Sequence, residues 1–514
     1  MKLSPLLRKA IIEIICLLYI LLFVYAAVNK LLEFETFKIQ LGQSPIIMPY
    51  AKVLSVLVPV TELTIAGLLI FSRLRFVGLL LSFSLMTMFT VYIIIILNWS
   101  YFIPCSCGGI LEKMGWTEHL VFNLVFTILS LVGLLLIKIS TPDNQQLYLH
   151  RLALSGRKRF LYVVSGVFLL SLTGIFMLYF SAEQNVQRNN AFQRRFPPHP
   201  LALIAARPLH YNSYYLAGIS HGNIYIGNST APLHALQIDT LLKTETSLSL
   251  RLRELKKNRY TYLQLRVKDS SFFITDRASS ILFRGTIGNW TADQINVTMP
   301  PFSSIEPINY NSFAIKTINS TSQEDELAVV RLESDPLVFK NPKLLTKQVD
   351  GIFDTDGILL YNNEQKRIIY PYYYRNQYIV ANQDAMLVSR NATIDTVKKA
   401  NIKIARDPRK NESVMAEMPL MINVSAATDG PYLYIKSNRL SKNEPEHILN
   451  EASIIDVYNF TKRTYLYSFY IYNYENEKAR SFAIRNNLLI VLTDKHIITY
   501  RLEKERLNPE PENK

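Results

Sequence analysis

Residues 100–116 read Ser100-Tyr-Phe-Ile-Pro-Cys105-Ser-Cys107-Gly-Gly-Ile-Leu-Glu-Lys-Met-Gly-Trp116, and long apolar runs flank them on both sides. Cys105 and Cys107 are two of the three cysteines in the chain, and Gly108 and Gly109 follow them directly. A short polar stretch between two runs that are each long enough to cross a bilayer must lie at the membrane surface. The sequence therefore predicts a cysteine-bearing hairpin at that surface.

Five apolar runs are predicted to be membrane-spanning helices, because each approaches the roughly 20 residues that cross the hydrocarbon core. The five runs are residues 10–28, 53–71, 76–97, 120–137 and 160–180. The first also resembles a secretory signal, but further spans follow it and no convincing cleavage site is present, so we interpret it as a retained helix. The expected fold is a membrane α-helical bundle followed by an all-β domain.

Basic residues in the short loops predict the orientation of these spans, since cytoplasmic loops are rich in Lys and Arg. The basic residues lie before the first span and in the loops after the second and fourth spans: Lys2, Arg8, Lys9, Arg73, Arg75, Lys138, Arg151, Arg157, Lys158 and Arg159. The cysteine hairpin and everything after the fifth span then share the opposite, extracytoplasmic side. Disulfides persist in that compartment.

Three residues inside or beside the spans need an interpretation. Glu62 follows Pro59 in the second span, and a carboxyl group at membrane depth indicates either a functional site or a neutral side chain hydrogen-bonded to a neighbouring helix. Lys30 stands where the first span leaves the membrane, and we expect snorkelling of its long side chain to explain it, with a specific role as the alternative. Cys16 is expected to be a buried, inert thiol.

The spacing of Cys105 and Cys107 supports more than one interpretation. A disulfide across a single residue departs from relaxed geometry, and strained, exposed disulfides are often labile or catalytic. Gly108 and Gly109 would give the backbone the freedom that such a small ring needs. The alternatives are a static clip, free structural thiols, or a metal site, although a lone Cys-x-Cys lacks the ligands for closed zinc coordination. The redox interpretation is favoured.

Residues 10–140 resemble the MauE/DoxX group of redox-associated membrane proteins. The resemblance rests on Tyr25-Ala-Ala-Val-Asn-Lys-Leu with Phe34 and Phe37 after the first span, on Pro59-Val-Thr-Glu-Leu in the second, and on Cys105-Ser-Cys107-Gly-Gly. It implies a four-helix fold, Cys105 and Cys107 as the redox pair, and a role in methylamine metabolism through maturation of a disulfide-rich dehydrogenase. Gly-Gly replaces the Phe-Gly expected after the pair, and the fifth span and the carboxy-terminal domain depart from the family pattern.

The predicted domain boundaries follow from changes in composition along the chain. Residues 1–140 form the four-helix membrane domain, 141–159 a basic cytoplasmic loop, 160–181 the fifth helix, 182–200 a linker, 201–502 a β domain and 503–514 a disordered tail. In the β domain, short apolar or alternating runs recur between polar turns at separations of about 50 residues, which predicts a β-propeller of about six blades. The alternative is a pair of β-sandwiches. The last run, 497–502, is expected to close the ring against an early strand.

The β domain offers little chemistry of its own. It has no cysteine, and its aromatic runs at 370–374 and 465–472 are interpreted as strand packing before a recognition face. Asp354-Thr-Asp-Gly lacks the remaining ligands of a calcium loop. We therefore predict no metal, no bound cofactor and no catalytic group in this domain, and interpret it as a binding platform.

The predicted function is a thiol–disulfide relay of a bacterial inner membrane. Cys105 and Cys107 are the reacting residues, with Glu62, Lys30, Gly108 and Gly109 in support. Whether it is an enzyme stays open, and the expected partners are the lipid bilayer and either an extracytoplasmic protein client or a thioredoxin-like protein. The net charge is +15, but the basic residues are scattered along the polar part of the chain or lie beside spans. Basic residues beside spans set orientation, so no nucleic-acid partner is expected. The alternatives are a membrane-anchored propeller receptor or sensor and, less favoured, a transporter built around Glu62.

Overall fold

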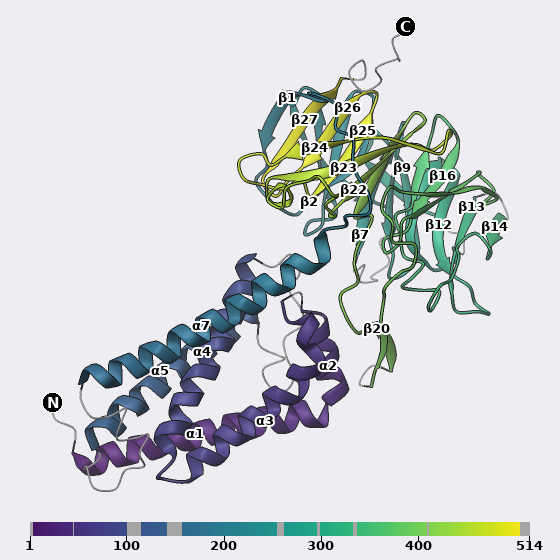
Figure 1. The fold of residues 1–514 in the computed structure, drawn as a ribbon. Helices are drawn as coiled ribbons and strands as arrows, with labels where there is room; N and C mark the ends of the chain where they lie inside the picture. The colour runs from purple at the N-terminus through teal and green to yellow at the C-terminus, as the bar shows by residue number, and fades with distance from the viewer. Residues whose placement is uncertain are drawn as a thin grey trace. The chain divides into compact units, whose positions relative to one another are not determined.

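A computed structural model describes residues 4–44, 46–99, 115–140, 157–253, 262–295, 299–332, 337–408 and 411–503. The chain divides into two compact units, shown in Figure 1. The first contains Met1–Val186 and Ile402–Pro419, and the second contains Gln187–Asn401 and Leu420–Lys514.

The first unit is helical. Its helices are α1 (Pro5–Leu32), α2 (Phe34–Gly42), η1 (Met48–Tyr50), α3 (Ala51–Ile70), α4 (Arg75–Trp99), α5 (Trp116–Ser140) and α7 (Arg157–Gln187). In the described residues, five helices are long and apolar enough to cross a membrane: Pro5–Leu32, Met48–Ile70, Arg75–Asn98, Trp116–Ile137 and Lys158–Ser181. The five predicted spans are thereby confirmed. The protein is a membrane protein with a helical bundle.

The helices extend beyond the apolar runs that predicted them. The helix α1 begins five residues before the predicted span because Pro5 fits the first helical position and the Ser4 hydroxyl accepts a hydrogen bond from the Leu7 amide. Between the first and second predicted spans, the structure has two further helices, α2 and η1. The buried face of α2 carries Phe37 and Leu41, which pack with residues of α3, α4 and α7.

Gly133 of α5 lies close to Leu79 of α4. A β-carbon at position 133 would lie 2.9 Å from the Leu79 Cδ1 atom, so the Leu79 side chain would have to shift. The surrounding core is apolar and joins residues of α1, α3, α4, α5 and α7. Cys16 is 1% exposed within this core, as expected for a buried thiol.

The second unit is all-β, and its described strands form six sheets of four or five strands. The first three sheets contain β2 (Tyr214–Ser220), β3 (Asn223–Asn228), β4 (His234–Asp239) and β5 (Glu245–Ser249); then β6 (Arg251–Leu252), β7 (Leu263–Lys268), β8 (Ser271–Asp276), β9 (Ile281–Thr286) and β10 (Thr291–Gln294); then β11 (Phe302–Asn309), β12 (Ser312–Ile318), β13 (Asp325–Arg331) and β14 (Leu337–Asn341).

The last three sheets complete the set. They contain β15 (Leu360–Asn362), β16 (Arg367–Pro371), β17 (Gln377–Ala381) and β18 (Leu387–Ala392); then β21 (Ser425–Asp429), β22 (Tyr432–Ser437), β23 (Ala452–Asn459) and β24 (Thr464–Tyr472), with the short helix α8 (Ile448–Glu451); then β25 (Ser481–Arg485), β26 (Leu488–Leu492), β27 (His496–Leu502) and β1 (Leu201–Pro208). Within each sheet, successive strands pair antiparallel, apart from the parallel pair β6 and β10.

Contacts between one edge strand of each sheet and an edge strand of the next make a closed ring. The strand β2 contacts β7, β7 contacts β11, β11 contacts β15, β15 contacts β21, β21 contacts β25, and β25 contacts β2 again. A separate apolar core fills the space between each sheet and the next. A ring of radially packed four-stranded sheets is a β-propeller. The arrangement is a six-bladed propeller-like domain.

The strand β1 closes this ring by pairing antiparallel with β27, so that Leu201 lies opposite Leu502 and Pro208 opposite His496. This confirms the prediction that the last strand pairs with an early one. Tyrosines of both aromatic runs pack in the core, in agreement with their interpretation as strand packing. Tyr370 and Tyr372 are fully buried, and Tyr467 is nearly so. The residues before β1 also pack on the propeller, since the Asn189 amide donates to the Leu440 carbonyl at 2.9 Å.

One hairpin stands apart from the six sheets. The strands β19 (Ile404–Asp407) and β20 (Glu412–Met415) pair only with each other and group with the helical unit. There the Gln43 side-chain amide donates to the Met415 carbonyl at 2.8 Å.

Candidate functional site

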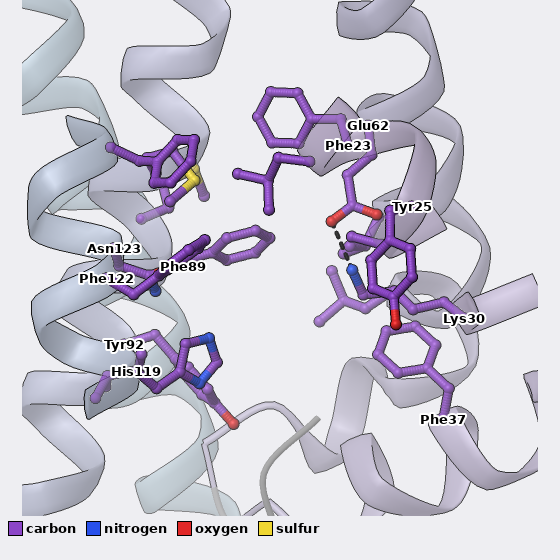
Figure 2. Close-up of a pocket in the computed structure, with 18 of the residues that line it drawn as sticks. Phe23, Tyr25, Lys30, Phe37, Glu62, Phe89, Tyr92, His119, Phe122 and Asn123 are labelled. Atoms are coloured by element: carbon purple, nitrogen blue, oxygen red, sulfur yellow. Dashed lines mark hydrogen bonds and ion pairs between the residues drawn. The ribbon is translucent and has the colours of Figure 1, made fainter. Parts of the chain in front are cut away.

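The helical unit encloses a cavity of roughly 600 Å³, a volume typical of small-molecule sites. Most of its walls are apolar or aromatic, and a few polar groups converge in it (Figure 2). The lining residues are Leu18, Leu21, Leu22, Phe23, Tyr25, Ala26, Lys30, Phe37, Leu41, Ile47, Leu54, Val58, Glu62, Met86, Met88, Phe89, Tyr92, Ile93, Trp116, His119, Phe122, Asn123, Phe126, Ile175 and Leu178.

A buried ion pair forms one wall of this cavity. The Lys30 ammonium in the last turn of α1 donates to the Glu62 carboxylate in α3, with 2.6 Å between Nζ and Oε1. The Glu62 side chain is 1% exposed and that of Lys30 is 13% exposed. Phe37 of α2 adds an aromatic face 5.8 Å from the ammonium. Removing one partner of such a pair would leave an uncompensated buried charge, which is why the two residues depend on each other.

A proline lies about one helical turn before Glu62 in α3. Pro59 lies inside α3 and has no N–H, so the Ser55 carbonyl four residues earlier receives no helical hydrogen bond from it. Pro59 and Glu62 are three residues apart, close to one helical turn, and both are buried.

The expectation that snorkelling explains Lys30 is corrected by this geometry. The ammonium points to Glu62 inside the unit, because a buried carboxylate attracts it more strongly than the interface does. Glu62 is paired with the Lys30 ammonium of the neighbouring helix α1. Lys30 and Glu62, two of the predicted supporting residues, are therefore brought together.

The opposite wall carries polar residues that were not among the predicted site residues. His119 and Asn123 of α5 and Tyr92 of α4 face the ion pair across the cavity in Figure 2. The His119 ring lies 6.0 Å from the ring of Trp116, the first residue of α5. Within the described residues, the Nδ1 atom of His119 and the Oε2 atom of Glu62 are buried and have no hydrogen-bond partner. His119 and Glu62 line opposite walls of the cavity, although these two atoms themselves have almost no accessible surface.

A sequence signal for this wall did exist. His119 and Asn123 are four residues apart, so they share one face of a helix in a span that otherwise contains few polar residues. The signal was weak because His119 stands at the start of its span, where polar side chains are ordinary. Only the packing of α4 and α5 against α1 and α3 reveals what this face meets.

The predicted redox residues Cys105, Cys107, Gly108 and Gly109 lie outside the described residues. Their proposed role remains a prediction from the sequence. Trp99 and Gly115 are the described residues nearest to them along the chain.

Residues 8–136 match the model of a family described as methylamine utilisation protein MauE. These residues form a MauE-type domain. The MauE domain contains most of α1, all of α2, α3 and α4, and most of α5, with both walls of the cavity described above. Only Ile175 and Leu178 of α7 come from outside the MauE domain. The chain is thus a MauE domain joined to a fifth helix and a propeller-like domain.

The matched solved structures are distant. A solved structure of a DUF4221-family member from Bacteroides vulgatus is 12% identical, with 59% of this chain and 97% of that chain covered at a TM-score of 0.37. A candidate TolB from Agrobacterium tumefaciens is 9% identical, with 53% of this chain and 82% of that chain covered at a TM-score of 0.30. No curated protein matches. The propeller assignment therefore rests on the sheet order and the ring of contacts.

Metal binding finds no support in the described part of either unit, where no group of three or more His, Cys, Asp or Glu residues could hold an ion. Asp354, considered as part of a calcium loop, instead accepts hydrogen bonds from backbone amides of its own turn, at 2.6 Å from Gly351 and 3.1 Å from Asp350. These bonds more than offset the effect of burial and lower the pKa of Asp354. The Asp354 carboxylate therefore stabilises its own turn.

Proposed function

We propose that this protein relays thiol–disulfide equivalents through Cys105 and Cys107 at the extracytoplasmic surface of a bacterial inner membrane. Its client is a secreted or periplasmic protein recognised by the propeller-like domain. The observation that supports this most strongly is the MauE match, because residues 8–136 include the Cys-x-Cys motif and both members of the Lys30–Glu62 pair. The family description also motivates a role in methylamine utilisation, by maturation of a disulfide-containing dehydrogenase.

The orientation in this proposal comes from the basic loops. Arg73 and Arg75 follow α3, and Lys158 and Arg159 begin α7, so the positive-inside rule assigns these ends to the cytoplasm. The ends of α1 and α4 and the start of α5 are then extracytoplasmic. The residues between α4 and α5, and those after α7, share that side.

The relay conserves atoms and electrons. A client thiolate attacks the Cys105–Cys107 disulfide, a mixed disulfide forms, and the second client thiolate then resolves it. The client gains a disulfide, and Cys105 and Cys107 are reduced to thiols. The Cys105–Cys107 pair has then taken up two electrons and two protons from the client. The propeller-like domain contains no cysteine, so its contribution would be recognition.

Alkylation trapping in cells tests the relay. We expect Cys105 and Cys107 to switch between oxidised and reduced states, and Cys105→Ser or Cys107→Ser to slow disulfide formation in the client at least about tenfold. Cys16→Ser is the matched control, because that thiol is buried in the helical core, and it should change nothing. A pair that never changes redox state would contradict the relay.

The receptor alternative makes the reverse prediction. A protein that acts only as a membrane-anchored sensor keeps full function when Cys105 and Cys107 are both serine. It loses function when the propeller-like domain is removed. Scoring both variants for the same phenotype, with the chain detected in the membrane in each case, separates the two functions.

A further inference from the structure

The hairpin of β19 and β20 belongs to the connection between two propeller sheets, which runs from the end of β18 at Ala392 to the start of β21 at Ser425. Its residues nevertheless group with the helical unit, as Ile402–Pro419. The chain therefore leaves the propeller-like domain, joins the helical unit and returns. A single connection thus belongs to both units.

The strand β20 and the residues that follow it hold the carboxy-terminal end of α2. The Gln43 side-chain amide donates to the Met415 carbonyl at 2.8 Å, although the two residues are 372 positions apart in the chain. The Met418 backbone amide donates to the Gly42 carbonyl at 3.2 Å. The last carbonyls of a helix have no donor within the helix, so the bond from Met418 caps α2 from outside.

Gly42 makes this close contact possible. A β-carbon there would meet the backbone carbonyl oxygen of Ala416 closer than any real contact, and a backbone atom cannot turn aside as the end of a side chain can. The φ angle of Gly42 is not positive, so its backbone conformation does not require glycine. The hairpin is therefore the structural reason for a glycine at this position.

The helix α2 forms one side of the cavity. Phe37 and Leu41 on its buried face line the cavity, and the Phe37 ring lies beside the Lys30 ammonium (Figure 2). A helix of nine residues is marginally stable by itself, so contacts outside it determine its position. One such contact is on α4, where the Tyr92 hydroxyl donates to the Ser44 hydroxyl at 2.8 Å. The hairpin is another.

Hydrogen bonds fix the two ends of the connection in the propeller-like domain. On the way out, the Val397 carbonyl accepts from the Asn376 amide at 2.7 Å. On the way back, the Asn423 side-chain amide donates to the Tyr372 carbonyl at 2.6 Å and to the Arg375 carbonyl at 3.1 Å. Tyr372, Arg375 and Asn376 belong to the turn between β16 and β17. Both ends of the connection are therefore attached to one turn of the propeller.

We propose that the β19–β20 hairpin is a clasp through which the propeller-like domain holds α2 against the cavity. While the hairpin is bound, Phe37 and Leu41 close that side of the cavity. When the hairpin leaves α2, the helix loses its cap and this side of the cavity opens, as under a lid. Because the connection is fixed to a propeller turn, a change in that turn alters access to the cavity.

Alkylation of a cysteine placed on α2 tests the clasp. The full-length chain carries Phe37→Cys, with Cys105→Ser and Cys107→Ser, and labelling by N-ethylmaleimide is followed by peptide mass spectrometry. Gly42→Ala should speed labelling at position 37 at least about tenfold, the effect expected from the loss of two hydrogen bonds. Gly67→Ala is the matched control, because a β-carbon on this α3 glycine meets nothing within 4 Å. Equal rates in the two variants would overturn the clasp.

Cys16 reports in the same experiment whether the helical unit stays folded. This thiol is buried in the helical core and does not line the cavity, so it should remain unlabelled when only α2 moves. If Gly42→Ala exposes Cys16 as well, Gln43→Leu decides, because it removes the side-chain bond to Met415 and adds no clash with the backbone. Labelling at position 37 should then rise about fivefold. An unchanged rate would show that the hairpin does not hold α2.

The part of the propeller in the clasp is tested at the base of the connection. Asn423→Ala removes the hydrogen bonds to the turn between β16 and β17, so labelling at position 37 should speed up here too. Asn459→Ala is the matched control, because Asn459 is also buried but accepts hydrogen bonds within its own turn. Equal rates in these two variants would show that the propeller does not act on α2. Since the reporter chain lacks Cys105 and Cys107, the result is independent of the proposed relay.

Discussion

At the scale of single residues, Arg194 shows how one side chain holds the segment before β1 on the propeller. Its Nε atom donates to Asp456 at 2.7 Å and its Nη1 atom to Glu444 at 2.6 Å. Nη1 also donates to the Arg439 carbonyl at 2.7 Å. All three charged side chains are at most 4% exposed. Such a network is stable only when every partner is present.

Arg194→Ala should therefore destabilise the propeller-like domain by about 3–5 kcal/mol, because it leaves two buried carboxylates without a cation. The neighbouring Arg195→Ala is the control: Arg195 is exposed and lies over the Tyr465 ring, so its loss should cost about 1 kcal/mol or less. Thermal unfolding of the full chain in detergent, followed by near-ultraviolet circular dichroism, measures both. Equal effects of the two substitutions would show that Arg194 is not the structural link described.

At the scale of elements, the propeller depends on β27. This strand pairs with β26 on one side and with β1 on the other, so it joins the two ends of the domain sequence. Thr499 lies at its centre, opposite Ala205 of β1 and Ile490 of β26, and is fully buried. A closing sheet built from both chain ends leaves no open edge between first and last blades.

Thr499→Pro should weaken that closure by about 3 kcal/mol, because proline cannot donate to the strand ladder and its ring crowds the neighbouring strand. Thr246→Pro is the matched control in β5, an outer strand of its sheet where Thr246 is exposed and pairs on one side only. We expect a clearly smaller fall in melting temperature for the control. A fall of the same size would argue against a special role for the closing sheet.

At the scale of the whole molecule, two lysines join neighbouring blades of the ring. Lys268 of β7 donates to the Pro307 carbonyl of β11 at 2.6 Å and lies 4.3 Å from the Tyr361 ring of β15. Lys436 of β22 donates to the Ala479 carbonyl just before β25. Desolvation lowers the pKa of Lys268 to about 8, and desolvation with the nearby Lys478 lowers that of Lys436 to about 8.

These shifts predict the pH dependence of stability. An unfolded lysine keeps its proton up to a pKa of 10.5, whereas these two lose theirs near 8 in the folded domain. Between those values the unfolded chain binds more protons, so stability should rise with pH, by about 2 kcal/mol per lysine from pH 7.5 to 9.5. Melting temperatures across that range measure it. Lys268→Met should halve the slope, and an unchanged slope would contradict the assignment.

Much of this molecule follows from the sequence alone. Uninterrupted apolar runs predict five helical spans. In lipid, a single apolar segment can satisfy its backbone N–H and C=O groups only by forming a helix. Alternating runs between polar turns predict the blades, and a final β-prone run predicts ring closure. Both signals are local, since each depends on residues that are neighbours in the chain.

The polar residues that meet at the cavity could not be predicted from the sequence. Lys30 and Glu62 are 32 residues apart, and neither residue type specifies the other as its partner. His119 and Asn123 share a helical face that the sequence indicates, but what that face meets is decided by how α5 and α4 pack against α1 and α3. The sequence by itself determined which segments enter the membrane and which form sheets, because transfer from water acts on each segment separately. Only the tertiary structure decided which polar groups meet, because that depends on the packing of helices distant in the chain.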